Sequence, residues 1–499
     1  MVVLSASGKP QTESGLGEET YGLKREIGIF GSFSIGYADV GADIYVALGI
    51  LALYAQSAAP LALLIASVTY VATGLTYAEL SSRYPVAGGG NFYANKALGP
   101  LHGFLAGWGL MLDYTIDIAL FALATSGYVG AVLETFLGST LVLHEPYYAL
   151  IAILVIVSLL ILNIFGISYS SKFNMMVVAV NLATISLMMV LGLYVVIEQH
   201  AFFSWLAQLK PQFPSAHNFA YGITLAMASF IGIESISQAA EETKSPSKVI
   251  PKSTKLSIVA VLVIAVFLSF LSVSIVPWQV TAAGAQDPLF LLAGAMPFIG
   301  GFFAIWMAFM GMWVCTVSTN TGIIGVSRVT FSMGRLDLLP TSFARLHKKF
   351  RTPYMTILVF SLIAIMLILV NMFTPSAELL NLVASLYNFG ALVAYMYVNF
   401  SALVLRLRED ADIPYHSPLN ISVTYRGRKV KLSLIHLIGL VACASIWTIL
   451  LFSHPLGREV GLVWFAAGLA LYWAYRKKRG LPVAPSLRRA KDFARRIKR

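Results

Sequence analysis

The chain has 499 residues, of which 58% are hydrophobic and only 12% are charged, and it carries a net charge of +12. Soluble domains have about 25% charged residues, so this composition excludes an ordinary soluble protein and indicates an integral membrane protein. Both cysteines, Cys315 and Cys443, lie in apolar runs, which argues against a disulfide framework. No cleavable signal peptide is evident, because residues 1–24 are polar and the first apolar segment is too long for one.

Twelve apolar segments follow one another along the chain, each close to or above the length that crosses a membrane. We expect them at 27–54, 59–82, 101–132, 147–165, 173–197, 217–240, 256–280, 297–333, 354–373, 379–405, 432–453 and 459–476. The predicted fold is therefore an all-α integral membrane protein with 12 transmembrane helices. We divide the chain into a tail (1–26), a ten-helix core (27–405), a loop (406–431), helices 11 and 12 (432–476) and a basic tail (477–499).

Basic residues are distributed unequally between the two sides of the predicted membrane. If the N-terminus is inside, only Lys210 and Arg458 fall in external loops, which otherwise carry acidic residues. The positive-inside rule then predicts a multi-pass protein of the cell membrane with both termini in the cytoplasm. Because topology accounts for the positive charge, we expect no nucleic-acid partner. Within the loop at 406–431, two β-prone runs around an Arg-Gly turn indicate a small cytoplasmic β-hairpin.

The first span contains acidic residues and glycines at membrane depth. Its segment GSFSIGYADVGADIY (31–45) places Asp39 and Asp43 among three glycines. Ionisable residues inside spans are costly and usually functional, and irregular backbone is tolerated there only beside a cavity or under protein cover. The sixth span, YGITLAMASFIGIESISQAAEE (221–242), is interrupted at the corresponding place. Two broken helices in matching five-span halves predict a 5+5 inverted repeat that works by alternating access.

Three stretches resemble signatures of the amino acid–polyamine–organocation (APC) superfamily. They are YAELSSRYPVAGGGNFYANKALGP (77–100), GIESISQAAEETKSPSKVIPKS (232–253) and NTGIIGVSRVTFSMGRLDLLP (320–340). The resemblance covers spans 1–10 in order. It implies an amino acid permease with the leucine-transporter type of fold, in which spans 1, 2, 6 and 7 rock against spans 3, 4, 8 and 9. We expect no enzyme activity, no cofactor and no metal.

The resemblance places the substrate between the breaks in spans 1 and 6. The residues expected there are Tyr37, Ala38, Asp39, Gly41, Ala42, Asp43, Asp117, Phe230, Ile231, Gly232 and Glu234. Asp43 stands where the family usually has a glycine, which disfavours a substrate carboxylate beside it. Four ionised carboxylates in a low dielectric repel one another, so we expect at least one of them to hold a proton. Asp113, one helical turn before Asp117, is interpreted as a partner of Ser or Thr hydroxyls in neighbouring spans.

Two further groups of residues are expected to couple transport to an ion and to close the cytoplasmic gate. The ion-coupling residues are expected to be Asn181, Ser318 and Thr319, with a proton favoured over sodium. Hydrogen bonds of the two hydroxyls within their own helix explain Ser318 and Thr319 at least as well. At cytoplasmic helix ends, an ion-pair network that closes the inner gate is expected from Glu79, Arg83, Glu241 and Arg328.

The sequence thus predicts a secondary active transporter of amino acids or related amines, coupled to protons. Its partners are the small-molecule substrate, a coupling cation and the lipid bilayer. The alternative is a proton-coupled potassium or other cation importer of the same fold. That alternative rests on the carboxylates and on the run Tyr37-Ala38-Asp39-Val40-Gly41, which looks like the YGDIG run of potassium-uptake permeases.

Overall fold

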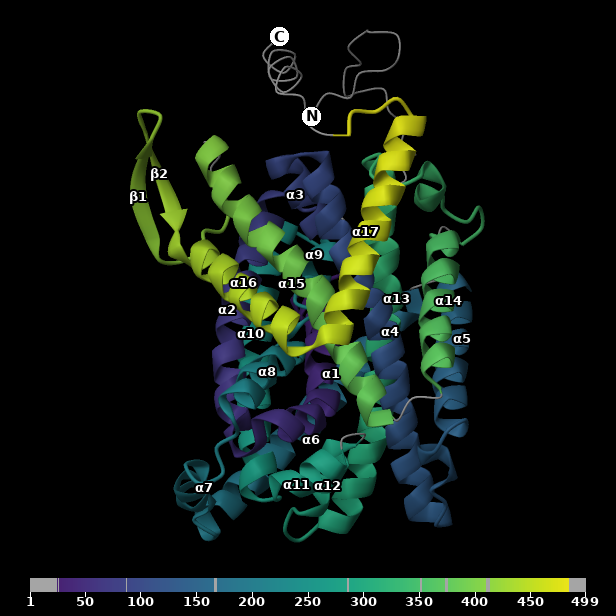
Figure 1. Cartoon of the computed structure of the whole chain (residues 1–499), viewed down its shortest axis with the longest axis vertical. Helices are drawn as coiled ribbons and strands as arrows, with labels where there is room; N and C mark the ends of the chain where they lie inside the picture. The colour runs from purple at the N-terminus through teal and green to yellow at the C-terminus, as the bar shows by residue number, and fades with distance from the viewer. Residues whose placement is uncertain are drawn as a thin grey trace.

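The computed structural model describes residues 25, 27–86, 88–165, 168–284, 287–350, 352–372, 376–409 and 413–483. Nearly all of this chain is helical (Figure 1). The greater parts of the expected tails at 1–26 and 477–499 lie outside the described residues.

Each predicted apolar segment falls on helical structure. The long helices are α1 (Ile29–Ala55), α2 (Ala59–Arg83), α4 (Pro100–Leu137), α5 (Tyr147–Phe165), α6 (Ser168–Glu198), α8 (Ala216–Ala226), α10 (Pro246–Ser274), α13 (Gly300–Arg335), α14 (Tyr354–Asn371), α15 (Ser376–Arg408), α16 (Leu434–Ser453) and α17 (Pro455–Lys478). Short helices connect them: α3 (Gly90–Leu98), α7 (Ala201–Leu209), α9 (Ser235–Gln238), α11 (Trp278–Ala283) and α12 (Pro288–Gly294). Single 3₁₀ turns are η1 (Gln56–Ala58), η2 (Leu141–Leu143), η3 (Met227–Phe230), η4 (Ala240–Glu242) and η5 (Thr341–Ala344).

Length and composition identify nine candidate membrane spans within the described part of the chain. The first of these, Ile29–Arg83, contains both α1 and α2. Tyr354–Val370 is a shorter apolar helix, and α17, which has three basic residues in its last turn, is not among the nine. The protein is therefore a multi-pass membrane protein, while the count of twelve spans and the inverted repeat stay predictions.

Helix packing forms two groups that meet at α1. In the first group, α2 packs on α10, and α1 contacts both α8 and α10. In the second, α4 packs on α13 and α5, and α14 packs on α5 and α13. α1 also contacts α13 and α6, so it lies between the two groups and is buried along most of its length.

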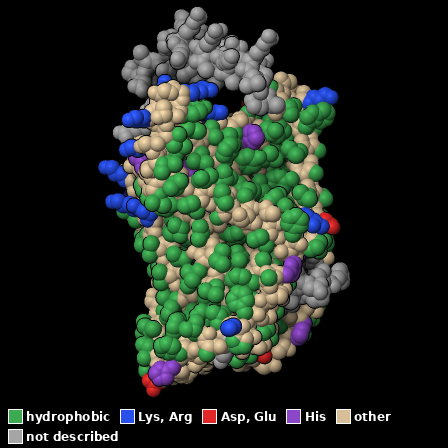
Figure 2. Space-filling view, turned by 60° about the vertical axis from the view of Figure 1, so that its left-hand side comes forward, with side chains coloured by type: hydrophobic (Ala, Val, Ile, Leu, Met, Phe, Trp, Pro, Cys, Tyr) green, Lys and Arg blue, Asp and Glu red, His purple; other side chains and the backbone are tan. Residues whose placement is uncertain are grey.

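A small hairpin rises at one end of the molecule. Its strands are β1 (Asn420–Tyr425) and β2 (Arg428–Ser433), which pair antiparallel with Asn420 opposite Ser433 and Tyr425 opposite Arg428. Helices α7, α11 and α12 lie at the opposite end (Figure 1). On the face shown in Figure 2, hydrophobic side chains cover the middle, and Lys and Arg gather toward the hairpin end. This distribution matches the charge asymmetry of the sequence.

Candidate functional site

The first span is not broken, contrary to the sequence prediction. α1 runs without interruption from Ile29 to Ala55, through every residue from Tyr37 to Asp43. Glycine permits a break but does not impose one, and here the glycines allow close packing instead. A Cβ on Gly36 would lie 2.5 Å from the Ile236 side chain, and a Cβ on Gly41 would lie 3.0 Å from the Tyr37 ring. The backbone amides of this segment are therefore held inside a helix.

The sixth span is broken where the sequence predicts. α8 ends at Ala226, and the 3₁₀ turn η3 leads to Ile231, which is extended (φ −91°, ψ 150°). Gly232 has φ of +110°, and α9 begins at Ser235. Only glycine adopts this backbone without strain. A Cβ at Gly232 would also lie 2.7 Å from Cγ of Asp39, so the break lets the chain approach α1 closely.

Asp39 and Asp43 lie one turn apart on α1 and are both almost completely buried. The Ser235 hydroxyl, at the start of α9, donates a hydrogen bond to Oδ2 of Asp39. The Tyr387 hydroxyl of α15 donates to Oδ1 of Asp43 at 3.4 Å. The second oxygen of each carboxyl has no hydrogen-bond partner among the described residues. Each buried carboxyl is thus only half satisfied, which is costly for an ionised group.

Two acidic residues of α4 complete the cluster. Asp117 is packed against α13, where a Cβ on Gly322 would lie 2.3 Å from its Oδ2. Within the part of the chain that the structure describes, neither of its oxygens has a hydrogen-bond partner. Asp113 was expected to accept hydrogen bonds from Ser or Thr, and it receives none. Its carboxyl lies near that of Glu234 instead. Two carboxyls can share a hydrogen bond only when one of them carries a proton.

Tyr395 of α15 connects the broken span to the acidic cluster. Its hydroxyl donates to Oε2 of Glu234 at 2.6 Å and accepts from the backbone N–H of Gly232 at 3.1 Å. Tyr395 and Tyr387 are absent from the sequence prediction, because a tyrosine in an apolar span gives no spacing signal. Only the packing of α15 brings them to the acidic residues.

Five carboxyls are buried without an ion pair to a basic side chain in the described part of the chain. They are Asp39, Asp43, Asp113, Asp117 and Glu234, each at most 2% exposed. None of the ion pairs recorded among the described residues includes any of the five. Several uncompensated carboxylates cannot all stay ionised in such a place, so the cluster favours bound protons, a bound cation, or both.

Other residues predicted for the site lie elsewhere around it. Tyr37 and Gly41 are on the face of α1 turned toward α6, where the Tyr37 hydroxyl accepts from Nδ2 of Asn181 at 3.3 Å. Because α1 is helical, that face points away from Asp39 and Asp43. The remaining predicted members are buried close to the cluster on α1 and at the break in span 6: Ala38, Ala42, Phe230 and Ile231.

Among the described residues, no recorded hydrogen bond joins Asn181 to Ser318 or Thr319, so the prediction of one ion-coupling site stays a prediction. Asn181 accepts a hydrogen bond from the Tyr45 hydroxyl, which also contacts the Met307 sulfur at 3.6 Å. The Thr319 hydroxyl bonds its own helix at the Cys315 carbonyl, 3.0 Å away, as the alternative interpretation expected. Ser318 is buried, and its hydroxyl has no partner.

A cavity of about 50 Å³ lies between Ser235 and the ends of α9 and α13. Its lining includes Gln238, Asn320, Glu242 and Arg328. Arg328 forms an ion pair with Glu242 at 2.6 Å, and Arg335 pairs with Glu241 at 2.9 Å. A further cavity of about 10 Å³ lies against Asp43. Ligand pockets usually measure about 300–1,000 Å³, so the structure holds the site in a closed form.

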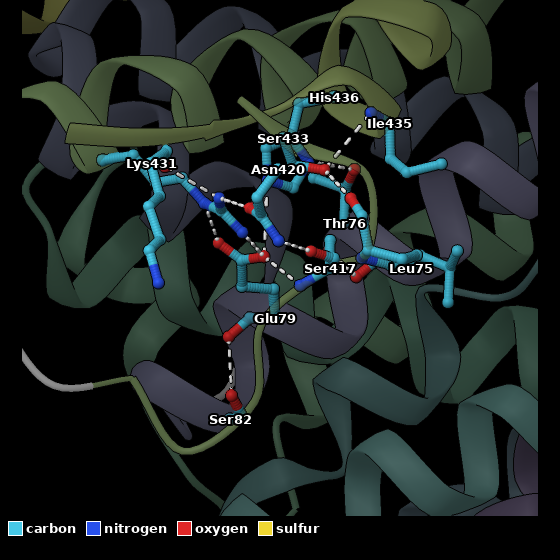
Figure 3. Close-up of polar contacts among 12 residues, drawn as sticks. Leu75, Thr76, Glu79, Ser82, Ser417, Asn420, Lys431, Ser433, Ile435 and His436 are labelled. Carbon is cyan, nitrogen blue, oxygen red and sulfur yellow. Dashed lines mark hydrogen bonds and ion pairs between the residues drawn. The ribbon is translucent and has the colours of Figure 1, made fainter. Parts of the chain in front are cut away.

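Among the described residues, the recorded ion pairs of Glu79 and Arg83 are separate from those of Glu241 and Arg328. Arg83 pairs with Glu409 at 2.8 Å. Glu79 accepts from Nε and Nη2 of Arg406, each at 2.6 Å, and from the Ser417 backbone N–H at 2.7 Å (Figure 3). These contacts join α2 to α15 and to the base of the hairpin.

The opposite end of the molecule has an acidic group of its own. Asp287 precedes α12 outside the candidate spans, and its burial, together with the carboxylate of Glu134, raises its pKa to about 7. The side chain therefore titrates near neutral pH.

Comparison with known proteins identifies the family to which this architecture belongs. The model of a protein family described as "Amino acid permease" matches residues 27–475, from the start of α1 to near the end of α17. The chain belongs to the amino acid permease family. It is accordingly a membrane transporter of the APC superfamily, as the motifs after spans 2 and 6 and in span 8 indicated.

Several characterised permeases are similar over most of their length. The branched-chain amino acid permease BcaP of Bacillus subtilis is 27% identical, over 91% of this chain and 94% of its own. The methylthioribose transporter of the same organism is 26% identical, over 89% of this chain and 91% of its own length. The low-affinity putrescine importer PlaP of Escherichia coli is 26% identical, over 82% of this chain and 84% of its own length.

Proposed function

We propose that this permease is a secondary active transporter that moves amino acids or related amines across the cell membrane by alternating access, coupled to protons. The observation that carries the proposal is the group of five buried carboxyls beside the break in span 6, without a basic partner among the described residues. Such a group attracts a protonated amine and can exchange protons.

The substrate amine is proposed to lie between α1, α4 and the break in span 6. Asp39 and Asp117 supply negative charge there, and the interrupted backbone at Ile231 and Gly232 supplies polar groups that no helix ladder uses. The relatives are named for amino acids, a thiosugar and a diamine. These names support a small organic substrate such as an amino acid or amine, but they do not identify which compound this protein carries.

The proton is proposed to be shared between Asp113 and Glu234. Their carboxyls lie near each other, and the Tyr395 hydroxyl donates to Glu234 at 2.6 Å. Ionising both would place two negative charges side by side in a dry site, which is costly. Proton loss and substrate binding are thereby linked, because an arriving cation replaces the charge of the proton.

The ion pairs Arg328–Glu242 and Arg335–Glu241 are proposed to close the cytoplasmic side. They join the segment after α9 to the last turns of α13, and Arg328 and Glu242 line the cavity that leads toward Ser235. With this side and both termini in the cytoplasm, the core at 27–405 performs the movement, and helices 11 and 12 at 432–476 flank it.

A proton-coupled importer of potassium or another cation is the second candidate. The same carboxylates favour it, because hard cations prefer oxygen ligands. In that case Asp43 and Asp117 would each ligate the ion, and removing either one would abolish transport.

Uptake by proteoliposomes decides between these functions. The assay compares a labelled amino acid panel, putrescine and rubidium, with and without an imposed pH gradient, for the wild type and for Asp117→Asn. We expect uptake of an amino acid or amine that a pH gradient stimulates, with altered affinity or pH dependence in Asp117→Asn. Rubidium uptake that is lost in Asp117→Asn, with no amino acid or amine uptake, would establish the second candidate. Uptake of an amino acid or amine that is indifferent to the pH gradient would refute proton coupling.

A further inference from the structure

The β1–β2 hairpin is a basic element placed directly against a membrane span. Residues 413–433 contain no Asp or Glu, and the hairpin carries four cationic residues: Arg426, Arg428, Lys429 and Lys431. β2 ends at Ser433, and the candidate span Leu434–Ser453 begins at the next residue. No spacer separates the cations from the membrane.

The geometry of a strand fixes how far these cations lie from the span. At about 3.3 Å per residue, Lys431 lies roughly 10 Å and Lys429 roughly 17 Å before Leu434. The polar headgroup layer is several ångströms thick on each side of the hydrocarbon, and charges are felt over a Debye length of about 8 Å beyond it. Lys431 therefore reaches the headgroups, and Lys429 lies within their field. Both side chains are exposed, and Figure 3 shows that of Lys431 directed away from the buried contacts.

The hairpin also exposes apolar side chains of the kind that lie at a membrane interface. Ile421 is 44% exposed, Tyr425 is 39% exposed, and Leu419 just before β1 is 59% exposed. In the antiparallel register Lys431 faces Ser422 and Lys429 faces Thr424, whereas Ile421 faces Leu432. Because neighbouring side chains alternate between the faces of a strand, the two lysines share one face, and the apolar residues share the other face with Arg428. The hairpin is amphipathic.

The base of the hairpin is fixed to the helices. Arg406 of α15 donates to the Lys431 carbonyl at 2.9 Å and to Oδ1 of Asn420 (Figure 3). The Ser433 hydroxyl donates to the Pro418 carbonyl at 2.6 Å. These bonds use the backbone of Lys431 and leave its amine outside the contacts. The basic face is thereby held in place before any ligand arrives.

We propose that the β1–β2 hairpin binds the headgroups of anionic phospholipids in the membrane that holds the protein. A basic cluster immediately beside a span is the arrangement that attracts such lipids, and the exposed apolar face adds contact with the interface. The hairpin is joined through Arg406 to Glu79 of α2, so bound lipid also stabilises the contact between α2 and α15.

The test uses the full-length protein in detergent micelles titrated with phosphatidylglycerol, with phosphatidylcholine as the reference lipid. The readout is the midpoint of thermal stabilisation against lipid concentration, together with the number of lipids retained in native mass spectrometry. The variant is Lys429→Gln with Lys431→Gln. The matched control is Lys348→Gln with Lys349→Gln, which removes the same charge from an exposed loop.

We expect the hairpin variant to bind phosphatidylglycerol about 30-fold more weakly, equivalent to about 2 kcal/mol for two basic side chains, and the control to bind it nearly as the wild type does. Unchanged binding in the hairpin variant, or an equal loss in the control, would overturn the proposal. So would a hairpin variant that loses affinity for a single-stranded RNA oligonucleotide while keeping its affinity for the lipid. Equal melting temperatures in phosphatidylcholine show that both variants are folded.

Discussion

The buried pair of Glu79 and Arg406 offers the sharpest test of what holds the hairpin end together. Their side chains are only 2% and 3% exposed. Replacing Arg406 with Met removes both charged bonds to Glu79 and leaves its carboxylate with the Ser417 N–H at 2.7 Å and with His436 at 3.4 Å. Leaving one partner of a buried ion pair uncompensated costs about 3–5 kcal/mol. We therefore expect Arg406→Met to lower the free energy of unfolding by that amount.

A double-mutant cycle separates the uncompensated charge from the lost contacts. Glu79→Gln alone leaves a buried guanidinium and is expected to cost about 3–5 kcal/mol as well. The double variant Glu79→Gln/Arg406→Met contains no buried charge and loses mainly the bonds of Arg406 to the hairpin, at about 1 kcal/mol each. It is therefore expected to be no less stable than either single variant, which is a strongly non-additive result.

The measurement is reversible unfolding in mixed micelles, followed by circular dichroism at a fixed pH. If the effects of the two single variants simply add in the double variant, the charges are not coupled and the reasoning is wrong. A cost below about 1 kcal/mol for Arg406→Met would show that solvent reaches Glu79, because exposed pairs contribute that little.

Three further outcomes are expected. Gly322→Ala should reduce transport and lower the melting temperature, because its Cβ would lie 2.3 Å from the Asp117 carboxyl and overpacking costs about 1–3 kcal/mol; a wild-type melting profile would contradict this. Arg328→Glu should raise the accessibility of a cysteine placed beside the cytoplasmic cavity, and adding Glu242→Arg should restore protection, as measured by thiol labelling. Asp287→Asn should melt at a higher temperature than the wild type at pH 8 but not at pH 4. Its raised pKa means that ionisation costs stability progressively as the pH rises from about 4 to 7, so an equal difference at both pH values would refute that cause.

The sequence predicts those structural features that depend on a local pattern of residues. Apolar runs located the helices, and the Arg-Gly turn located the hairpin. In span 6 the break follows from Gly232, whose backbone only glycine adopts without strain. In span 1 the same kind of pattern was misleading, because Gly36 and Gly41 serve packing while the helix ladder continues. A glycine in a sequence does not reveal which of these two uses it has.

The ion-pair partners and the tyrosines at the acidic cluster could not be predicted from the sequence, because they depend on contacts between distant parts of the chain. Charges at helix ends were foreseeable, but their pairing depends on which helix ends lie side by side. Glu79 meets Arg406, 327 residues later, rather than the residues of span 8. Tyr395 is 161 residues from Glu234, and nothing in the local composition of α15 marks its hydroxyl as part of the acidic cluster.

The position of Ser235 bears on the proposed proton coupling. Its hydroxyl donates to Asp39, and the same residue lines the cavity near Arg328. A hydroxyl can accept one proton while it gives up its own, so under that proposal Ser235 passes protons between the Asp39 carboxyl and water in the cavity. A change in the χ1 angle of Ser235 then makes or breaks this route, and side-chain rotamers change far faster than helices move.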